Sequence, residues 1–379
     1  MALNPNRLES ILRARAEDYI RENKLAWAEM AVNQAGKRLL TLRIGKQNIN
    51  DTLHAEKPLY RIASMTKPVT AVALLQQWDK GKIDLDAPLS DYLPGYRTMM
   101  LGHADGENLV LDGPATQPIK VFHLLTHTSG IDVVPLFPLI IRHHPGKTIA
   151  DTVEYYSKMP LAFEPFTATG YSMSAGFDIA AHLVEMVSGE DYASYLKRHI
   201  TDPLEMPDTT FAPTAEQESR IVGMHGRNEE GEAVEVPMTK GCVIDSIPVS
   251  CCLAGGGLAS TLEDYSKFAQ MLLNGGIGDN GARILSESAV ANMAAAHVPA
   301  SIMPGLESWG LGVRVVTSEE YPRGLAKGSF GWSGAYGSHF WVDPVNEITA
   351  VYMRNSLYDS GGCGGIGVQF EADVMSAME

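Results

Sequence analysis

The chain has 379 residues, of which 45% are hydrophobic and 20% charged, so it can form a sizeable core and is not globally disordered. This length corresponds to about two domains, or to one large domain with an insertion. With 30 basic and 45 acidic residues the net charge is −15, which excludes binding to nucleic acid through a basic surface.

The start of the chain and its cysteines indicate a protein of a reducing, aqueous compartment. Residues 1–24 are charged and amphipathic, unlike a secretory signal, and no apolar stretch approaches the ~20 residues of a membrane span. Four cysteines without a Cys-x-x-Cys pair are not a disulfide framework in a chain this long. We therefore expect a cytoplasmic protein that binds no membrane.

The first predicted elements are a helix and a β-hairpin. Residues 5–23 place apolar side chains near one face at helical spacing. Two short apolar runs, 26–32 and 39–44, flank a polar stretch and predict the hairpin. A second helix is predicted to begin close to Ser64, because Pro68 is tolerated only in a first turn.

The rest of the chain favours helices in its middle and strands near its end. Residues 82–215 are predicted to be mainly helical, most clearly at 176–187, and 223–240 to be an irregular surface segment. Further helices are predicted at 262–273, 287–296 and 368–378, and strands at 309–316, 331–341 and 347–352. This order predicts an α/β (α+β) fold, with one sheet assembled from both chain ends and a helical insertion between them.

The pattern Ser-x-x-Lys occurs twice, at Ser64–Lys67 and at Ser194–Lys197. Ser64 lies where an apolar strand-like run meets an apolar helix, and free backbone N–H groups at a helix start favour developing negative charge. The i, i+3 spacing places Lys67 on the same face, where an ammonium can activate a serine. A nucleophile and an ordinary N-cap serine are equally supported at Ser64 by the residues alone. The second pair is predicted to be solvated on a polar helix.

The sequence around Ser-Met-Thr-Lys resembles the serine β-lactamase and penicillin-binding-protein superfamily, in particular class C β-lactamases and, most closely, family VIII carboxylesterases. Other stretches match in the same order over roughly residues 55–355, namely His123–Ile131, Tyr171-Ser172, Asp202–Phe211, Leu253–Gly276 and Gly331–Pro344. The resemblance implies an antiparallel sheet domain from residues 1–81 and 250–379. It also implies a mainly helical insertion at 82–249 and an active site between the two parts.

The resemblance also assigns catalytic roles. Ser64 would be the acylated nucleophile, Lys67 its partner, and Tyr171 the general base whose phenolate Lys67 stabilises. A tyrosine of ordinary pKa ~10 can act as a base only near positive charge. The strand Gly331–Ala335 would replace the family's Lys-Thr-Gly strand, and the N–H groups of Ser64 and Ala335 would form the oxyanion hole.

Two departures from the family pattern favour an uncharged ester as substrate. Met173 stands where β-lactamases carry an asparagine, and a thioether cannot bind a substrate amide as that side chain does. Trp332 stands where they carry a lysine, so an indole replaces the cation that would bind a carboxylate. The residues expected to line the substrate site are Trp332, Ser333, Gly334 and Met173.

Some features carry no firm assignment. The apolar segment 133–146 either walls an acyl pocket or is a packed loop. His143 and His144 lack a further ligand at metal-binding spacing, so no metal is expected. His127 is predicted to make a structural hydrogen bond, and His339 has no predicted role.

These residues together predict a serine esterase that cleaves small uncharged carboxylic esters without a cofactor. Acyl transfer, D-amino-acid peptidase and weak β-lactamase activity at the same site are alternatives, as is a non-catalytic ligand-binding protein. A Gly-x-Gly-x-x-Gly run at 362–367 has too little chain after it for a dinucleotide fold, and no Gly-x-Ser-x-Gly elbow of an α/β-hydrolase is present. The physiological substrate and the oligomeric state do not follow from the sequence.

Overall fold

The computed structural model describes residues 2–49, 55–133, 136, 148–237, 242–244, 247–248, 253–357 and 365–379. Its strands are β1 Trp27–Gln34, β2 Lys37–Gly45, β3 Tyr60–Arg61, β4 Met100–Asp105, β5 Asn108–Pro114, β6 Met224–Arg227, β7 Ala233–Val236, β8 Cys242–Ile244, β9 Ile247–Pro248, β10 Ala259–Ser260, β11 Glu307–Trp309, β12 Arg314–Val316, β13 Phe330–Ser333, β14 His339–Asp343 and β15 Ile348–Met353. Its α-helices are α1 Pro5–Arg21, α2 Thr66–Asp79, α3 Val121–Leu125, α5 Ile149–Tyr156, α6 Ala175–Ser188, α7 Tyr192–Leu196, α8 Ala215–Ser219, α9 Leu262–Leu273, α10 Glu287–Met293 and α11 Ile366–Met375. Short helical turns are η1 Ala63–Met65, η2 Leu89–Asp91, η3 Pro94–Tyr96 and η4 Lys197–Thr201. Nearly all of the segment 133–146, with His143 and His144, lies outside the described residues.

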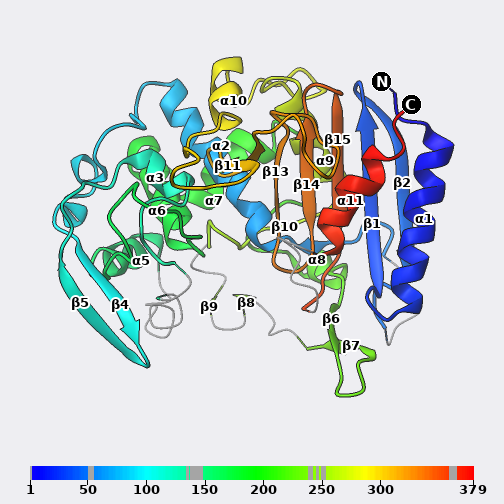
Figure 1. The fold of residues 1–379 in the computed structure, drawn as a ribbon, viewed down its shortest axis with the longest axis horizontal. Coiled ribbons are helices and arrows are strands. Elements are labelled where there is room, and N and C mark those ends of the chain that lie inside the picture. Colours follow the sequence, from blue (N-terminus) through cyan, green and yellow to red (C-terminus); the bar gives the residue numbers. More distant parts are fainter. Residues whose placement is uncertain are drawn as a thin grey trace.

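A seven-stranded antiparallel sheet is built from both ends of the chain (Figure 1). The strand order is β11-β12-β13-β14-β15-β1-β2. The early and late strands meet where β1 pairs with β15, from Glu29 opposite Met353 to Gln34 opposite Ile348. The predicted α/β fold with an antiparallel sheet from the two chain ends is therefore confirmed.

The strands alternate their side chains between two cores, as a period of two requires. On β1, Met30 and Val32 join the core under α1 and α11, whereas Trp27 and Ala31 belong to the core on the other face. The second core also contains buried side chains of α9, such as Phe268, and of the helical half of the molecule. Figure 1 shows α1 and α11 against the sheet and the helices α3, α5 and α6 at the opposite side.

Helix α2 connects these two halves and carries the Ser-x-x-Lys pair at its start. Every residue from Thr66 to Gln77 is buried, so the helix is enclosed on all sides. It packs against α6 and contacts α10. Pro68 lies in the first turn, as predicted, where its missing N–H leaves no helical bond unmade.

The helices predicted at 5–23, 176–187 and 262–273 correspond to α1, α6 and α9. None of the helices in the described residues is long and apolar enough to span a membrane.

Two predicted strands are each a pair of strands joined by a turn. The stretch 309–316 contains the end of β11, a reversal at residues 310–313, and β12. Its turn residues Leu311 and Val313 are fully buried, so the apolar pattern continues through the turn. The stretch 331–341 likewise splits into β13 and β14.

The hairpins β4–β5 and β6–β7 were not predicted. Strands β4 and β5 interrupt the stretch 82–215, and β5 exposes most of its side chains, so it lacks an alternating apolar pattern. Strands β6 and β7 form a regular hairpin within 223–240, which corrects the prediction of an irregular segment there. Met224 and His225 of this hairpin are buried, so it is only partly a surface feature.

Candidate active site

Ser64 lies in the single turn η1 immediately before α2 and is half-buried. The chain is fixed on either side of it. The Ile62 N–H donates to the Leu258 carbonyl at 3.0 Å, and the Leu258 N–H donates to the Thr66 hydroxyl at 3.1 Å. Ala63 has φ +44°, a left-handed conformation that costs a residue with a side chain roughly 1–3 kcal/mol. The turn that presents Ser64 is therefore strained and held by its surroundings.

Lys67 is completely buried, and its ammonium has three oxygen partners. The Nζ atom donates to the backbone carbonyls of Met173 and Gly255, both at 2.7 Å, and lies 3.3 Å from Ser64 Oγ. Gly255 allows this approach, because a Cβ there would lie 3.3 Å from Nζ and 3.2 Å from the Met173 oxygen. The predicted Ser64–Lys67 pair is therefore a contact in the structure. The Lys67 ammonium lies on the buried side of the Ser64 hydroxyl.

Tyr171 lies beside this pair, and its ring rather than its hydroxyl faces the cation. Lys67 Nζ is 5.0 Å from the centroid of the Tyr171 ring. The Tyr171 hydroxyl accepts a hydrogen bond from Trp332 Nε1 at 3.2 Å. Within the described residues it makes no hydrogen bond to Ser64 or Lys67. Serine, lysine and tyrosine therefore meet at one site, without a direct bond between the phenol and the ammonium.

Tyr171 belongs to an aromatic cluster whose other members are His127, Trp309 and Trp332. The rings of His127 and Trp309 lie 4.5 and 6.2 Å from that of Tyr171, and the two tryptophans are 4.7 Å apart. His127 Nδ1 accepts the Ser172 N–H at 3.1 Å, which is the structural hydrogen bond predicted for it. Burial and the charge of Lys67 hold the pKa of His127 well below its usual value, so the ring is neutral.

The end of β13 lies against the residues that precede Ser64. A Cβ on Gly334 would come within 2.3 Å of the Ile62 carbonyl oxygen, and the Ser338 hydroxyl donates to that same oxygen at 3.2 Å. This close approach places Ala335, which is exposed, next to the turn that carries Ser64. Glycine packing therefore holds the end of β13 against the chain just before Ser64, which is compatible with the predicted oxyanion donors.

The Beta-lactamase family model matches residues 12–371. The chain belongs to the beta-lactamase family.

The chain is similar in sequence to several proteins of known description. It is 30% identical over 349 residues to Protein Rv1367c of Mycobacterium tuberculosis, covering 87% of this chain and 85% of the relative. It is 27% identical over 333 residues to the lovastatin esterase of Penicillium rubens, covering 80% of this chain and 79% of the relative.

Solved structures of other proteins share this fold. One is EstCE1, a hydrolase with promiscuous acyltransferase activity, with a TM-score of 0.80, 19% identity and 98% of both chains covered. A family VIII carboxylesterase has a TM-score of 0.74 and 18% identity, again over 98% of both chains. At these identities the likeness establishes the fold, and it agrees with the resemblance found in the sequence.

Among the residues predicted to bind substrate, Trp332 and Met173 are half-buried at the site, whereas the Ser333 side chain is not directed to it. The Ser333 hydroxyl is hydrogen-bonded to His339 Nδ1 at 2.7 Å, and His339 Nε2 to Glu371 at 2.9 Å. Glu371 belongs to α11, on the opposite face of the sheet from Tyr171. The Ser333 hydroxyl is therefore part of a buried network behind β13, in which His339 is the central group.

The second Ser-x-x-Lys pair has no such surroundings. Asp191 caps the start of α7 and accepts the Ser194 N–H at 3.0 Å, and the Lys197 side chain is 68% exposed and paired with Asp202. This agrees with its prediction as a solvated pair. Among the described residues, no group of three or more His, Cys, Asp or Glu side chains is arranged to hold a metal ion.

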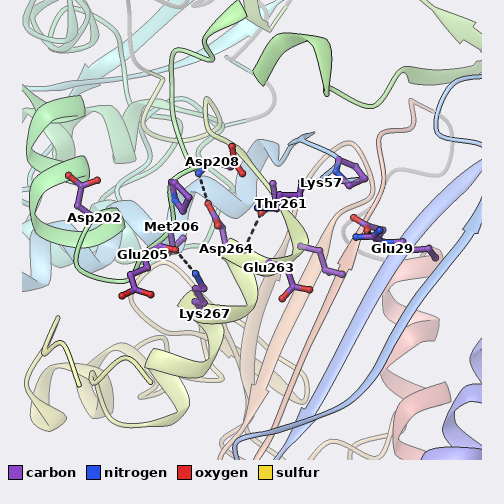
Figure 2. A pocket seen from close by; sticks show the side chains of 14 residues that line it. Glu29, Lys57, Asp202, Glu205, Met206, Asp208, Thr261, Glu263, Asp264 and Lys267 are labelled. Carbon is purple, nitrogen blue, oxygen red and sulfur yellow. Dashed lines mark hydrogen bonds and ion pairs between the residues drawn. The ribbon is translucent and has the colours of Figure 1, made fainter. Parts of the chain in front are cut away.

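A cavity of about 590 Å³ lies away from Ser64, between the loop around Met206 and the start of α9 (Figure 2). Its lining is rich in carboxylates. The buried Asp264 accepts the Asp208 N–H at 2.8 Å and the Thr209 hydroxyl at 3.0 Å, so it stabilises the loop next to the cavity. No serine–lysine pair lines this cavity. The candidate catalytic chemistry is therefore sought at the Ser64 site and not in the cavity.

Sequence reasoning missed three side chains at the Ser64 site: Trp309, Asp132 and Asp178. Trp309 directly precedes a turn that the apolar pattern conceals. Asp132 directly follows the family-like stretch His123–Ile131, and Asp178 interrupts the apolar face of α6. The signal that could have identified Asp178 is a carboxylate on an otherwise apolar helix face.

Proposed function

We propose that the chain is a serine esterase that cleaves small, uncharged carboxylic esters through an acyl-enzyme on Ser64. The observation that carries this proposal is the buried ammonium of Lys67 3.3 Å from the Ser64 oxygen, with Tyr171 beside both. A serine hydroxyl is a weak nucleophile unless a base takes its proton and positive charge stabilises the oxygen. An ammonium and a tyrosine phenolate next to the same hydroxyl can supply both.

In acylation, Tyr171 acts as a phenolate and accepts the proton of Ser64 as Oγ attacks the ester carbonyl carbon. The N–H groups of Ser64 and Ala335 stabilise the oxyanion that forms. The adduct then expels the alcohol, which leaves with the proton from Tyr171, and Ser64 becomes an ester. In deacylation, Tyr171 takes a proton from water, the hydroxide attacks the acyl carbon, and Ser64 leaves with that proton. One ester and one water give one acid and one alcohol.

The lining of the site supports an uncharged substrate. Trp332 and Met173 present apolar surface, and Trp332 has one N–H donor, which is bonded to Tyr171. A substrate carboxylate would have no cation from Trp332 to bind. The esterase among the sequence relatives is in keeping with the same class of substrate.

Acyl transfer from the same acyl-enzyme is the second candidate. The aromatic cluster that would accept the leaving alcohol of an ester can equally accept an acceptor alcohol, since the two steps are the reverse of one another. A sequence relative from Penicillium decumbens is described as the acyltransferase calJ, 28% identical over 337 residues. Product analysis with added short alcohols measures the partition between hydrolysis and transfer.

The deciding experiment compares two serine variants. Ser64→Ala should lower the turnover of short-chain aryl esters by about 10³-fold or more, and it should abolish labelling by a fluorophosphonate in intact-mass analysis. Ser194→Ala, in the second Ser-x-x-Lys pair, is the matched control and should retain wild-type turnover and labelling. Wild-type protein that stays unlabelled and inactive would point to a non-catalytic ligand-binding protein.

A further inference from the structure

Two buried carboxylates that have no part in the acyl-transfer steps lie behind Lys67. Asp132 and Asp178 are 0% and 1% exposed. Each interacts electrostatically with Lys67, whose charge acts to lower both carboxyl pKa values. Two carboxylates in an enclosed region are costly unless they stabilise something of opposite charge.

Asp132 and Lys67 bind opposite ends of the same peptide group. The Asp132 carboxylate accepts the Ser174 N–H at 2.7 Å and the Ala175 N–H at 2.8 Å. The carbonyl of that Met173–Ser174 peptide accepts from Lys67 at 2.7 Å. Carboxylate, peptide dipole and ammonium are therefore aligned in series, an arrangement in which each interaction strengthens the next.

Asp178 fixes the second carbonyl ligand of Lys67, that of Gly255, through the residue before it. Its carboxylate accepts the Ala254 N–H at 2.8 Å, directly before Gly255, whose carbonyl accepts from Lys67. The Ala254 carbonyl is in turn held by the Thr70 hydroxyl at 2.7 Å. The backbone at Ala254 is thus fixed on both sides, and this sets the direction of the Gly255 carbonyl.

One tyrosine links the two carboxylates. The Tyr156 hydroxyl lies 3.0 Å from the Ser174 hydroxyl and 3.4 Å from Asp178, and the Ser174 hydroxyl donates to Asp132 at 3.3 Å. The other Asp132 oxygen, Oδ1, is buried without a hydrogen-bond partner among the described residues. The Asp132 carboxylate therefore carries negative charge that the hydrogen bonds of the described residues do not fully satisfy.

We infer that Asp132 and Asp178 are positioning residues that hold the two carbonyl ligands of Lys67 and keep its ammonium charged beside Ser64. The inference rests on the proposed acyl-enzyme function, because it concerns the charge that activates the nucleophile. Both aspartates act through the backbone and through Lys67, and neither contacts the substrate.

The carboxyl groups titrate in the range where an esterase assay can follow them. Burial raises the pKa of Asp132 to about 6 and that of Asp178 to about 7. The ionisable groups that face the pair are Lys67 from α2, Tyr156 from α5 and Tyr96 from η3, besides the two carboxyls themselves. At pH 8 the pair is mainly ionised, and its charge is available to Lys67.

The test measures the rate of fluorophosphonate labelling of Ser64 against pH in single-turnover experiments. Asp132→Ala and Asp178→Ala should lower the rate about tenfold or more. Asp132→Asn and Asp178→Asn keep an oxygen acceptor but lose the charge, so they should label faster than the alanine variants. The high-pH limb of their profiles should move to lower pH by roughly one unit, because the ammonium loses its proton more easily.

The matched control is Asp264→Asn, which removes another buried carboxylate that binds a backbone N–H, at the cavity of Figure 2. It should lower stability and leave the labelling profile unchanged. If the asparagine variants fold and their profiles coincide with that of Asp264→Asn, the inference is wrong. If the wild type is not labelled, the proposed function itself fails.

A measurement on the wild type keeps the inference testable if the variants do not fold. The ¹³Cε resonance of Lys67 should show an ammonium at pH 7. A neutral amine there would overturn the inference, whereas continued labelling of Ser64 would leave the esterase proposal intact.

Discussion

In the proposed function, Trp332 sets the charge that a substrate would meet at the end of β13. Its indole N–H donates to the Tyr171 hydroxyl at 3.2 Å, and its ring packs against that of Trp309. Trp332 therefore contacts the proposed base and also forms part of the wall of the site. The β-lactamases that the sequence resembles carry a lysine here. The difference between the two side chains is one cation at the site.

Trp332→Lys should therefore move the preference of the site toward anionic substrates. A charge-assisted hydrogen bond contributes about 1.5–3 kcal/mol, so acylation by a penicillin should rise roughly tenfold to a hundredfold while turnover of a neutral aryl ester falls. Intact-mass kinetics measure the first and a spectrophotometric assay the second. Trp332→Phe, which has no cation, is the control. Equal penicillin labelling of the two variants would show that the cation at this position does not select the substrate.

The buried Asp178 makes the stability of the fold depend on pH. Burial is the main reason why the pKa of this carboxyl is raised from 3.8 to about 7. Between those two pH values the unfolded chain releases the proton first, so the contribution of Asp178 to stability is complete below pH 3.8 and is lost as the pH rises through about 7.

Asp178→Asn should remove this loss. Relative to the wild type, the Tm of the variant should increase between pH 4.5 and pH 8, as measured by thermal unfolding monitored by circular dichroism. Asp202→Asn, at an exposed position, should show no such trend. A variant that becomes relatively less stable with rising pH would contradict the raised pKa.

At the scale of elements, β13 is held in place from behind by a buried ionic network. Glu371 of α11 binds His339 at 2.9 Å, Arg314 at 2.5 Å and Arg323 at 2.9 Å, and His339 binds the Ser333 hydroxyl of β13. Burial opposes the charge of Glu371, but Arg314, His339 and Arg323 outweigh it and lower the pKa of this carboxyl to about 2. The stabilising contribution is present above the usual pKa of 4.5 and is lost as the pH falls toward 2.

Glu371→Ala should destabilise the protein by about 3–5 kcal/mol, because two guanidinium groups would lose a buried counterion. Chemical denaturation in urea measures the change, and Glu371→Gln should lose less. Glu319→Ala, which removes an exposed partner of Lys327, should change stability by less than about 1 kcal/mol. Equal effects of Glu371→Ala and Glu319→Ala would rule out a structural role for the network.

The elements also show what sequence reasoning could reach. The contact between Ser64 and Lys67 follows from helical spacing, so it was predictable from four residues. The other two ligands of Lys67 are backbone carbonyls 106 and 188 residues away in the chain, and a carbonyl has no residue type to identify it. Tyr171 was reached only through the family resemblance, and its contact with Trp332 Nε1 depends on packing between two distant elements.

At the scale of the whole molecule, the two ends of the described chain, Ala2 and Glu379, lie together. The Ala2 and Glu379 backbones exchange hydrogen bonds of 3.2 and 2.9 Å, and α1 packs beside α11 (Figure 1). Leu8 and Leu12 of α1 are buried in the same core as Phe370 of α11. The sheet domain is therefore completed only when both ends are present.

A circular permutant should fold and keep the proposed esterase activity. Joining the two ends through a short Gly-Ser linker and opening the chain at Gly106, in the tip of the β4–β5 hairpin, preserves every contact of α1. Removal of residues 1–21 should instead give insoluble or unfolded protein, because the core under α1 is exposed. Circular dichroism and ester turnover compare the two. A folded truncation beside an unfolded permutant would contradict this view of the ends.

The union of early and late strands in one sheet has a consequence for synthesis. Ser64 and Lys67 are synthesised before β13 and before β15, the partner of β1. Elements whose contacts are local can fold as they are synthesised, but this sheet cannot form until its late strands are available. The nascent chain therefore carries Ser64 and Lys67 before the strands beside them exist, and the proposed hydrolytic site can form only after those strands are translated.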